Sequence, residues 1–231
     1  MIPISTINNP TRRIPYLTYG LLLANIIVFI WQTTRPASEL TSLFLTLSVV
    51  PCQLSQNPLS LESALDLLRS MFLHASWLHL LGNMLYLWLF GSNVEDYFGH
   101  KAFLGLYLGS GVVAALVQTL IYSHVCVPLV GASGAIAGVL GSFFILYPGV
   151  HVRVAVIFFR FFLRTVKLPA LLVLGYWFLV QVFNGVTSLG VDTLSGGGVA
   201  FFAHIGGFVC GMVLTFIATM FNPPPRVPDI A

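Results

Sequence analysis

Two polar residues stand in apolar surroundings: Ser133, within VGASGAIAGVLGSF (residues 130–143), and His204, within AHIGGFVCG. A serine hydroxyl becomes a strong nucleophile when a neighbouring base takes its proton, and histidine is the side chain that most often does so. A serine in a glycine-rich membrane helix can instead serve packing, because small residues let helices approach closely. A buried histidine can likewise be a hydrogen-bonded structural residue. The rest of the sequence must distinguish these interpretations.

Donors for a developing negative charge are the next requirement of a serine nucleophile. His79 and Asn83 are four residues apart, so on a helix both point to one face. The backbone N–H of Ser133, at a helix start behind Gly131, is a third natural donor. The only acidic candidate nearby is Asp192, and we therefore expect a Ser-His dyad. Zinc or paired-aspartate chemistry is disfavoured, since the chain has no H-E-x-x-H motif and its apolar segments carry no pair of aspartates.

The elements that position these residues must lie in a membrane. The 231 residues are 57% hydrophobic and 7% charged, whereas soluble proteins are about one quarter charged. Six segments can each form a helix that crosses the roughly 30 Å hydrocarbon layer: 15–31, 72–91, 102–122, 127–147, 168–186 and 199–221. Arginines precede the first run as in a signal peptide, but this run is long and five more follow, so we expect a retained helix.

The basic residues predict the orientation, because loops rich in Lys and Arg stay on the cytoplasmic side. With the N-terminus inside, only Arg35 and Arg69 of the 10 basic residues lie outside. Both chain ends are then cytoplasmic, and the net charge of +3 indicates the anionic leaflet as partner rather than a nucleic acid. The even-numbered segments enter from outside, which puts Ser133 and His204 at one depth, roughly 8 to 9 Å below the outer surface.

Glycines follow both residues at helical spacing. Gly134 and Gly138 follow Ser133, and Gly207 and Gly211 follow His204. Two such stripes can pack backbone to backbone, which would bring a hydroxyl within reach of an imidazole.

The remaining segments lie outside the spans. We expect a cytoplasmic N-terminal segment (1–14), one membrane domain (15–221) and a cytoplasmic tail (222–231). The outer loop 33–70 contains two short apolar pieces, expected as interfacial helices. Over 151–167, basic residues separated by seven, four and three positions predict an amphipathic helix on the inner surface. Cys52 and Cys126 both fall outside, and the sequence leaves open whether they pair.

Four motifs, read together, point to a family. HASWLHLLGNM, GSNVEDYFGHKAF, GASGAIAG and AHIGGFVCG closely resemble the rhomboid intramembrane serine proteases, and the resemblance runs from about residue 15 to 221. It implies an all-α, six-transmembrane-helix bundle in which Ser133 is the nucleophile and His204 the general base. It also implies that His79, Asn83 and the Ser133 amide form the oxyanion hole. Supporting positions implied by the motifs are His74, Gly131, Gly134, Gly207 and Glu95, the last as an anchor of helix packing.

Two features depart from the family pattern. Some members carry an aromatic residue four positions after the nucleophile, which stacks on the catalytic histidine, whereas this chain has Ala137. Another group must then orient His204. Some members also carry a Trp-Arg pair where this chain has Leu65 and Asp66, which leaves the anchoring of the outer loop open.

The expected function is an integral membrane serine endopeptidase that hydrolyses transmembrane proteins near the outer face. The alternative is a catalytically silent rhomboid-like protein that binds or chaperones membrane proteins. Such relatives typically lack the serine or the histidine, and both are present here. A small transporter is a third interpretation that no feature requires. We expect no metal or organic cofactor, no nucleic acid, and transmembrane substrates and the bilayer as partners. A compact core favours a prokaryotic cell (cytoplasmic, inner) membrane, with the site open to the extracytoplasmic side.

Overall fold

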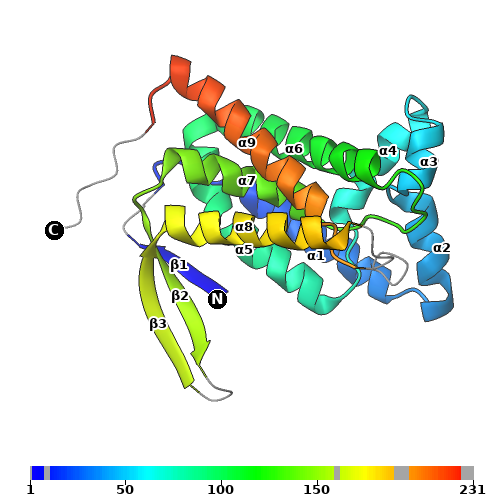
Figure 1. Cartoon of the computed structure of the whole chain (residues 1–231), viewed down its shortest axis with the longest axis horizontal. Helices are drawn as coiled ribbons and strands as arrows, with labels where there is room; N and C mark the ends of the chain where they lie inside the picture. The colour runs from blue at the N-terminus through cyan, green and yellow to red at the C-terminus, as the bar shows by residue number, and fades with distance from the viewer. Residues whose placement is uncertain (1, 8–10, 159–161, 190–197, 225–231) are drawn as a thin grey trace.

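The computed structural model describes residues 2–7, 11–158, 162–189 and 198–224. These residues form a helix bundle with a small antiparallel sheet at one end (Figure 1). The strands are β1 (Ile2–Ile7), β2 (His151–Phe158) and β3 (Phe162–Pro169). The helices are α1 (Tyr16–Thr33), α2 (Ala37–Leu47), α3 (Pro51–Gln56), α4 (Leu61–Arg69), the 3₁₀ helix η1 (Ser70–Phe72), α5 (Trp77–Phe98), α6 (His100–Ile121), α7 (Ser133–Leu146), α8 (Ala170–Ser188) and α9 (Phe201–Phe221).

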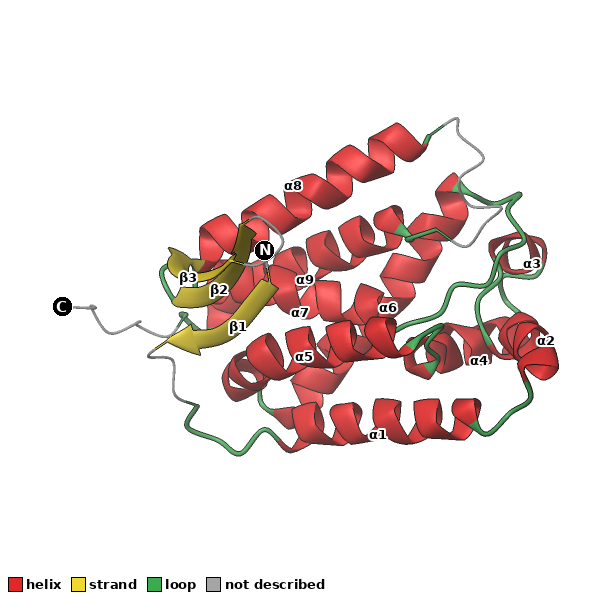
Figure 2. Ribbon diagram, turned by 90° about the horizontal axis from the view of Figure 1, so that it is seen from below, coloured by secondary structure: helices red, strands yellow, loops and turns green. Residues whose placement is uncertain are grey.

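Helix α7 lies at the centre of the bundle. It packs against α5, α6, α8 and α9, and Figure 2 shows α5 and α1 on one side of it and α8 on the other. All but three of its 14 residues are buried. Helix α9 lies very close to α7. A Cβ atom on Gly207 would overlap the backbone carbonyl of Gly134, and one on Gly211 would overlap that of Gly138. The two glycine stripes therefore meet.

Four of the described helices are long and apolar enough to cross a membrane: α1, α6, α8 and α9. Their outward faces are apolar, as Leu23 and Ile27 of α1 and Leu179 and Phe183 of α8 illustrate. Helix α5 is long enough, but polar residues lower its hydropathy. Helix α7 extends only about 21 Å, less than the roughly 30 Å hydrocarbon layer. Length and composition therefore account for four of the six expected spans.

The amphipathic helix expected over 151–167 is wrong, and so is a purely all-α fold. This segment forms β2 and β3, which pair antiparallel, and β1 from the N-terminal segment adds to β2. The physical reason lies in the two-residue period of HVRVAV: Val152 and Val154 are buried, whereas Arg153 between them is exposed. Arg153 stands opposite Lys167 in the sheet, so the basic residues share a strand pair and not a helical stripe.

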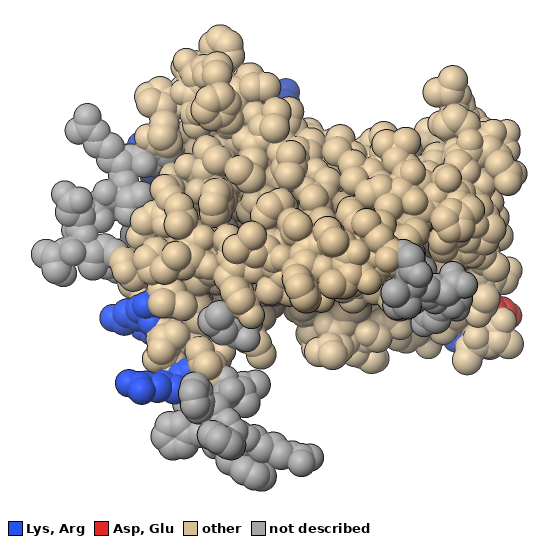
Figure 3. All heavy atoms as spheres, viewed as in Figure 1, with Lys and Arg blue, Asp and Glu red and all other residues tan. Residues whose placement is uncertain are grey.

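Basic side chains mark the end of the molecule that carries the sheet. On the face drawn in Figure 3, Lys and Arg gather mainly there, while most of the helical surface lacks charge. Arg153, Arg164 and Lys167 are exposed on the strands. Arg160 and residues 225–231 of the tail lie outside the described residues.

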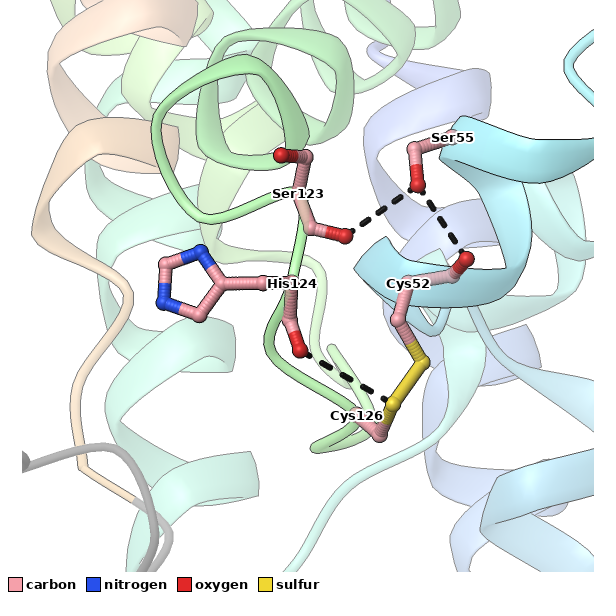
Figure 4. The surroundings of a disulfide bond; sticks show 5 residues. All are labelled: Cys52, Ser55, Ser123, His124 and Cys126. Atoms are coloured by element: carbon pink, nitrogen blue, oxygen red, sulfur yellow. Dashed lines mark hydrogen bonds between the residues drawn. A yellow bond between two sulfur atoms is a disulfide. The ribbon is translucent and has the colours of Figure 1, made fainter.

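The segment between α6 and α7 is irregular, although its sequence is apolar. Helix α7 begins at Ser133 and not near Val127, because the preceding residues bond instead to α3 and to the connection between α2 and α3. Leu129 N donates to Val49 O over 2.7 Å, and Cys52 N donates to Val125 O over 3.1 Å. The pairing that the sequence left open is present as a Cys52–Cys126 disulfide, which ties this segment to α3 (Figure 4).

Candidate active site

Ser133 and His204 are brought together from positions 71 residues apart. Ser133 is the first residue of α7 and His204 the fourth of α9, where the glycine stripes hold the two helices in close contact. The Ser133 Oγ atom lies 2.8 Å from His204 Nε2. At this distance the hydroxyl can donate to the lone pair of a neutral imidazole, which is the arrangement of a nucleophile and its general base.

The backbone in front of Ser133 faces His79. Gly131 has φ +126°, and a Cβ atom there would lie 2.7 Å from His79 Nε2 and 3.5 Å from Asn83 Nδ2. Glycine is therefore required by both conformation and space. The N–H groups of the first turn of α7 have no partner within the helix, and no side chain caps that turn. His79, Asn83 and the Ser133 amide thus converge on one small region.

Asn83 is held by a buried network that includes His74. Its Nδ2 lies 2.9 Å from His74 Nε2, while His74 Nδ1 lies 3.3 Å from Phe72 O. If Asn83 donates to Nε2, His74 Nδ1 carries the proton and donates to the carbonyl. Gln32 of α1 exchanges two hydrogen bonds with the His74 backbone, at 3.0 and 3.1 Å. His74 therefore supports Asn83 and the start of α5 from behind.

Two residues of α8, not identified from the sequence, contact the histidine. Gln181 Oε1 lies 2.8 Å from His204 Nδ1, and Gln181 is buried. The ring of Trp177 lies 5.8 Å from that of His204, tilted by 36°. The absence of an aromatic residue at Ala137 indicated that some other group must orient His204, but it did not say which.

Helix α9 is also held at its first turn by α6. Gln118 Oε1 accepts the backbone N–H of Ala203 over 3.1 Å, and Gln118 is only 2% exposed. A first-turn N–H is an orphan donor that needs such an acceptor. Gln118 thus fixes the helix that carries His204 without touching the imidazole.

A cavity of about 740 Å³ opens onto the Ser133–His204 pair. Its walls come from α5, α7, α8 and α9, and they include His79, Asn83 and Trp177. Apolar residues from α2 and η1 extend it. A chamber of this size can hold several residues of an extended peptide against the serine.

Glu95 lies far from this chamber. It is 16 residues beyond His79 on α5, roughly 24 Å along the helix axis. Its carboxylate accepts the backbone N–H groups of Leu17 and Thr18 at 2.9 and 2.7 Å, so it caps the start of α1. The one acidic candidate for a triad, Asp192, lies outside the described residues. Among the residues that the structure describes, no cluster of His, Cys, Asp and Glu could hold a metal ion.

Comparison with known proteins matches residues 62–221 to the family model described as the Rhomboid domain. The presenilin-associated rhomboid-like protein, mitochondrial, of Bos taurus is 32% identical over 154 residues, 63% of this chain and 36% of that protein. Rhomboid protein 1, mitochondrial, of Saccharomyces cerevisiae is 29% identical over 204 residues, 85% and 51% of the two chains. Rhomboid-like protein 11, chloroplastic, of Arabidopsis thaliana is 30% identical over 165 residues, 69% and 54%.

Two facts follow from these relatives. The chain spans about half or less of the length of the bovine and yeast proteins that it matches. The expected location in a prokaryotic cell membrane is wrong by this comparison, because the relatives are named as mitochondrial or chloroplastic. The compact core that suggested it carries no information on the compartment. Because the Rhomboid domain model matches residues 62–221, more than half of the chain, and all four motifs lie within this range, the chain belongs to the rhomboid family.

Proposed function

We propose that this protein is an intramembrane serine endopeptidase that hydrolyses peptide bonds of transmembrane proteins. The observation that carries the proposal is the 2.8 Å contact between Ser133 Oγ and His204 Nε2 at the wall of a large cavity. A packing role for Ser133 explains neither the imidazole at its hydroxyl nor the convergence of His79 and Asn83 beside it.

The mechanism begins with the neutral imidazole. His204 Nε2 takes the Ser133 proton while Oγ attacks the carbonyl carbon of the scissile bond. The carbonyl oxygen becomes negative, and the Ser133 amide, Asn83 and His79 are the donors that stabilise it. His204 then protonates the leaving nitrogen, and the C–N bond breaks to leave an acyl ester on Ser133. Water, deprotonated by His204, hydrolyses this ester and restores the hydroxyl.

The substrate must present an exposed carbonyl at this serine. A transmembrane helix hides its carbonyls in internal hydrogen bonds, so it must unwind locally before attack. We expect substrates with small or helix-breaking residues at the cut. The cavity wall formed by α5 and α8 is the side from which such a segment would approach.

We further propose six membrane crossings, including the short helix α7 and the polar helix α5. The Cys52–Cys126 disulfide joins the chain before α5 to the chain after α6, so both lie on one side. If α6 crosses, α5 must cross as well. The β1–β2 pairing joins the segment before α1 to the segment after α7, which in turn requires α7 to cross.

In this topology the sheet and both chain ends lie on the side rich in basic residues, and the active site opens near the disulfide side. Helix α7 is too short to cross the membrane alone, but it is buried among other helices. The irregular backbone that precedes it can therefore lie at membrane depth, because such backbone is tolerated where protein or a cavity surrounds it. The names of the relatives favour an organelle membrane as the location.

The direct test is cleavage of a model transmembrane substrate by the purified protein in detergent or liposomes. Wild type should cleave, whereas Ser133→Ala and His204→Ala should lose at least about 1,000-fold in rate, as removal of a nucleophile or its base requires. Ser110→Ala, a buried serine on α6, is the matched control and should retain activity. Equal cleavage by Ser133→Ala would overturn the nucleophile assignment. An inactive but folded wild type that still binds the substrate would instead favour the catalytically silent binder.

A further inference from the structure

We propose that Gln181 of α8 is the positioning residue that orients His204, and so completes a Ser-His-Gln arrangement. The proposal rests on the proposed protease function for its kinetic consequences, but its structural part is independent. The Gln181 Oε1 atom lies 2.8 Å from His204 Nδ1, on the side of the ring opposite to Ser133.

The chemistry of the imidazole makes this contact directional. A neutral ring has one N–H donor and one lone-pair acceptor. The side-chain oxygen of Gln181 can only accept, so Nδ1 must carry the proton and Nε2 must present its lone pair to Ser133. That tautomer is the one in which His204 can act as the base. The opposite tautomer would point a hydrogen at the hydroxyl oxygen and block proton transfer.

The amide group of Gln181 is itself held in place. Its Nε2 atom lies 3.4 Å from Trp177 O, one turn earlier on α8, which directs Oε1 toward the ring. Trp177 packs its own ring against the imidazole. Together they occupy the role left open by Ala137, and they do so from a different helix.

If Gln181 served packing alone, an apolar residue of similar volume in its place should leave the cleavage rate unchanged. The other buried residues of α8, Ala170, Leu174 and Gly185, are apolar or small, so a leucine of similar volume at position 181 should pack at least as well as glutamine. The positioning role predicts that Gln181→Leu remains folded, with a kcat about tenfold or more below wild type and an unchanged KM, because Gln181 does not line the cavity. Gln181→Glu keeps an acceptor and should restore most of the rate.

The pH profile separates the two roles without depending on the fraction of folded enzyme. Among the described residues, the groups facing His204 that can gain or lose a proton are Ser133 on α7 and His79 on α5. Its contacts on α8, Gln181 and Trp177, are uncharged. A carboxylate at position 181 would stabilise the imidazolium. The acid limb of kcat/KM should therefore move to higher pH in Gln181→Glu. Gln118→Leu, which removes the cap of α9, should lower thermal stability and leave this limb in place.

A second readout does not require activity. In protein labelled with ¹⁵N-histidine, and with His204→Asn used for assignment, His204 of the wild type should be in the Nδ1–H tautomer, and Gln181→Leu should shift it toward a mixture. An unchanged tautomer in Gln181→Leu would overturn the proposal even if the rate falls. If the wild type fails to cleave any substrate, the protease function fails, while the tautomer measurement still decides the role of Gln181.

Discussion

At the scale of single residues, the site depends on backbone that only glycine can supply. We predict that Gly131→Ala lowers kcat/KM by about 100-fold or more, because the added Cβ, 2.7 Å from His79 Nε2, must displace that ring from the proposed oxyanion hole. The φ of +126° adds strain for alanine. Cleavage assays check this. Gly105→Ala, where a Cβ meets no atom within 4 Å, is the control and should leave the rate unchanged. A normal rate in Gly131→Ala would contradict the assigned geometry.

The residues of the site differ in how far the sequence predicts them. Ser133, His204, His79 and Asn83 stand out because polar side chains are rare in apolar spans, and their spacing places them on shared helical faces. The structure brings these four together. Gln181 carries no such signal, since a single glutamine in a membrane helix usually serves helix contacts. Its role depends on the orientation of α8 toward α9, which no local pattern specifies.

At the scale of elements, Glu95 joins the end of α5 to the start of α1. We predict that Glu95→Gln destabilises the protein by about 1 to 3 kcal/mol, because its carboxylate accepts from two α1 amides and from the Thr18 hydroxyl. Thermal unfolding in detergent measures this. Cleavage per folded molecule should be retained, since the carboxylate is distant from Ser133.

The control for this prediction is Glu62→Gln. Glu62 pairs with Arg69 at 2.7 Å, but its side chain is 65% exposed, so loss of the pair should cost less than about 1 kcal/mol. Equal loss of stability in both variants would argue against a capping role for Glu95.

Element boundaries and types follow from competing local forces. Apolar runs predict where helices lie but not where they begin, so α5 and α7 start later than expected. The residues before α7 remain apolar, yet they are drawn into backbone bonds with α3 and η1. In the sheet, valines at alternate positions outweigh the helical spacing of the basic residues. The segment HVRVAV has the two-residue period of a strand, whereas the spacing of the basic residues over 151–167 favours a helix.

At the scale of the whole molecule, the topology can be tested with single cysteines at three places: before α4, at the start of α6 and in β3. In a Cys210→Ser background, the exposed positions Leu59, Lys101 and Thr165 would each be replaced singly by cysteine. Cys52 and Cys126 stay protected as a disulfide. Sealed vesicles of uniform orientation are then treated with a membrane-impermeant maleimide, and detergent-treated samples confirm that each cysteine can react.

Six crossings predict that Leu59→Cys reacts from one side, while Lys101→Cys and Thr165→Cys react only from the other. Each position tests a particular helix, because Lys101 follows α5 and Thr165 follows α7. Lys101→Cys on the side of Leu59→Cys would mean that α5 does not cross, although the disulfide would then have to bridge the two faces of the membrane. Thr165→Cys on that side would exclude α7, and the β1–β2 pairing would have to form across the bilayer. The six-crossing topology is therefore compatible with both long-range links, the Cys52–Cys126 disulfide and the β1–β2 pairing.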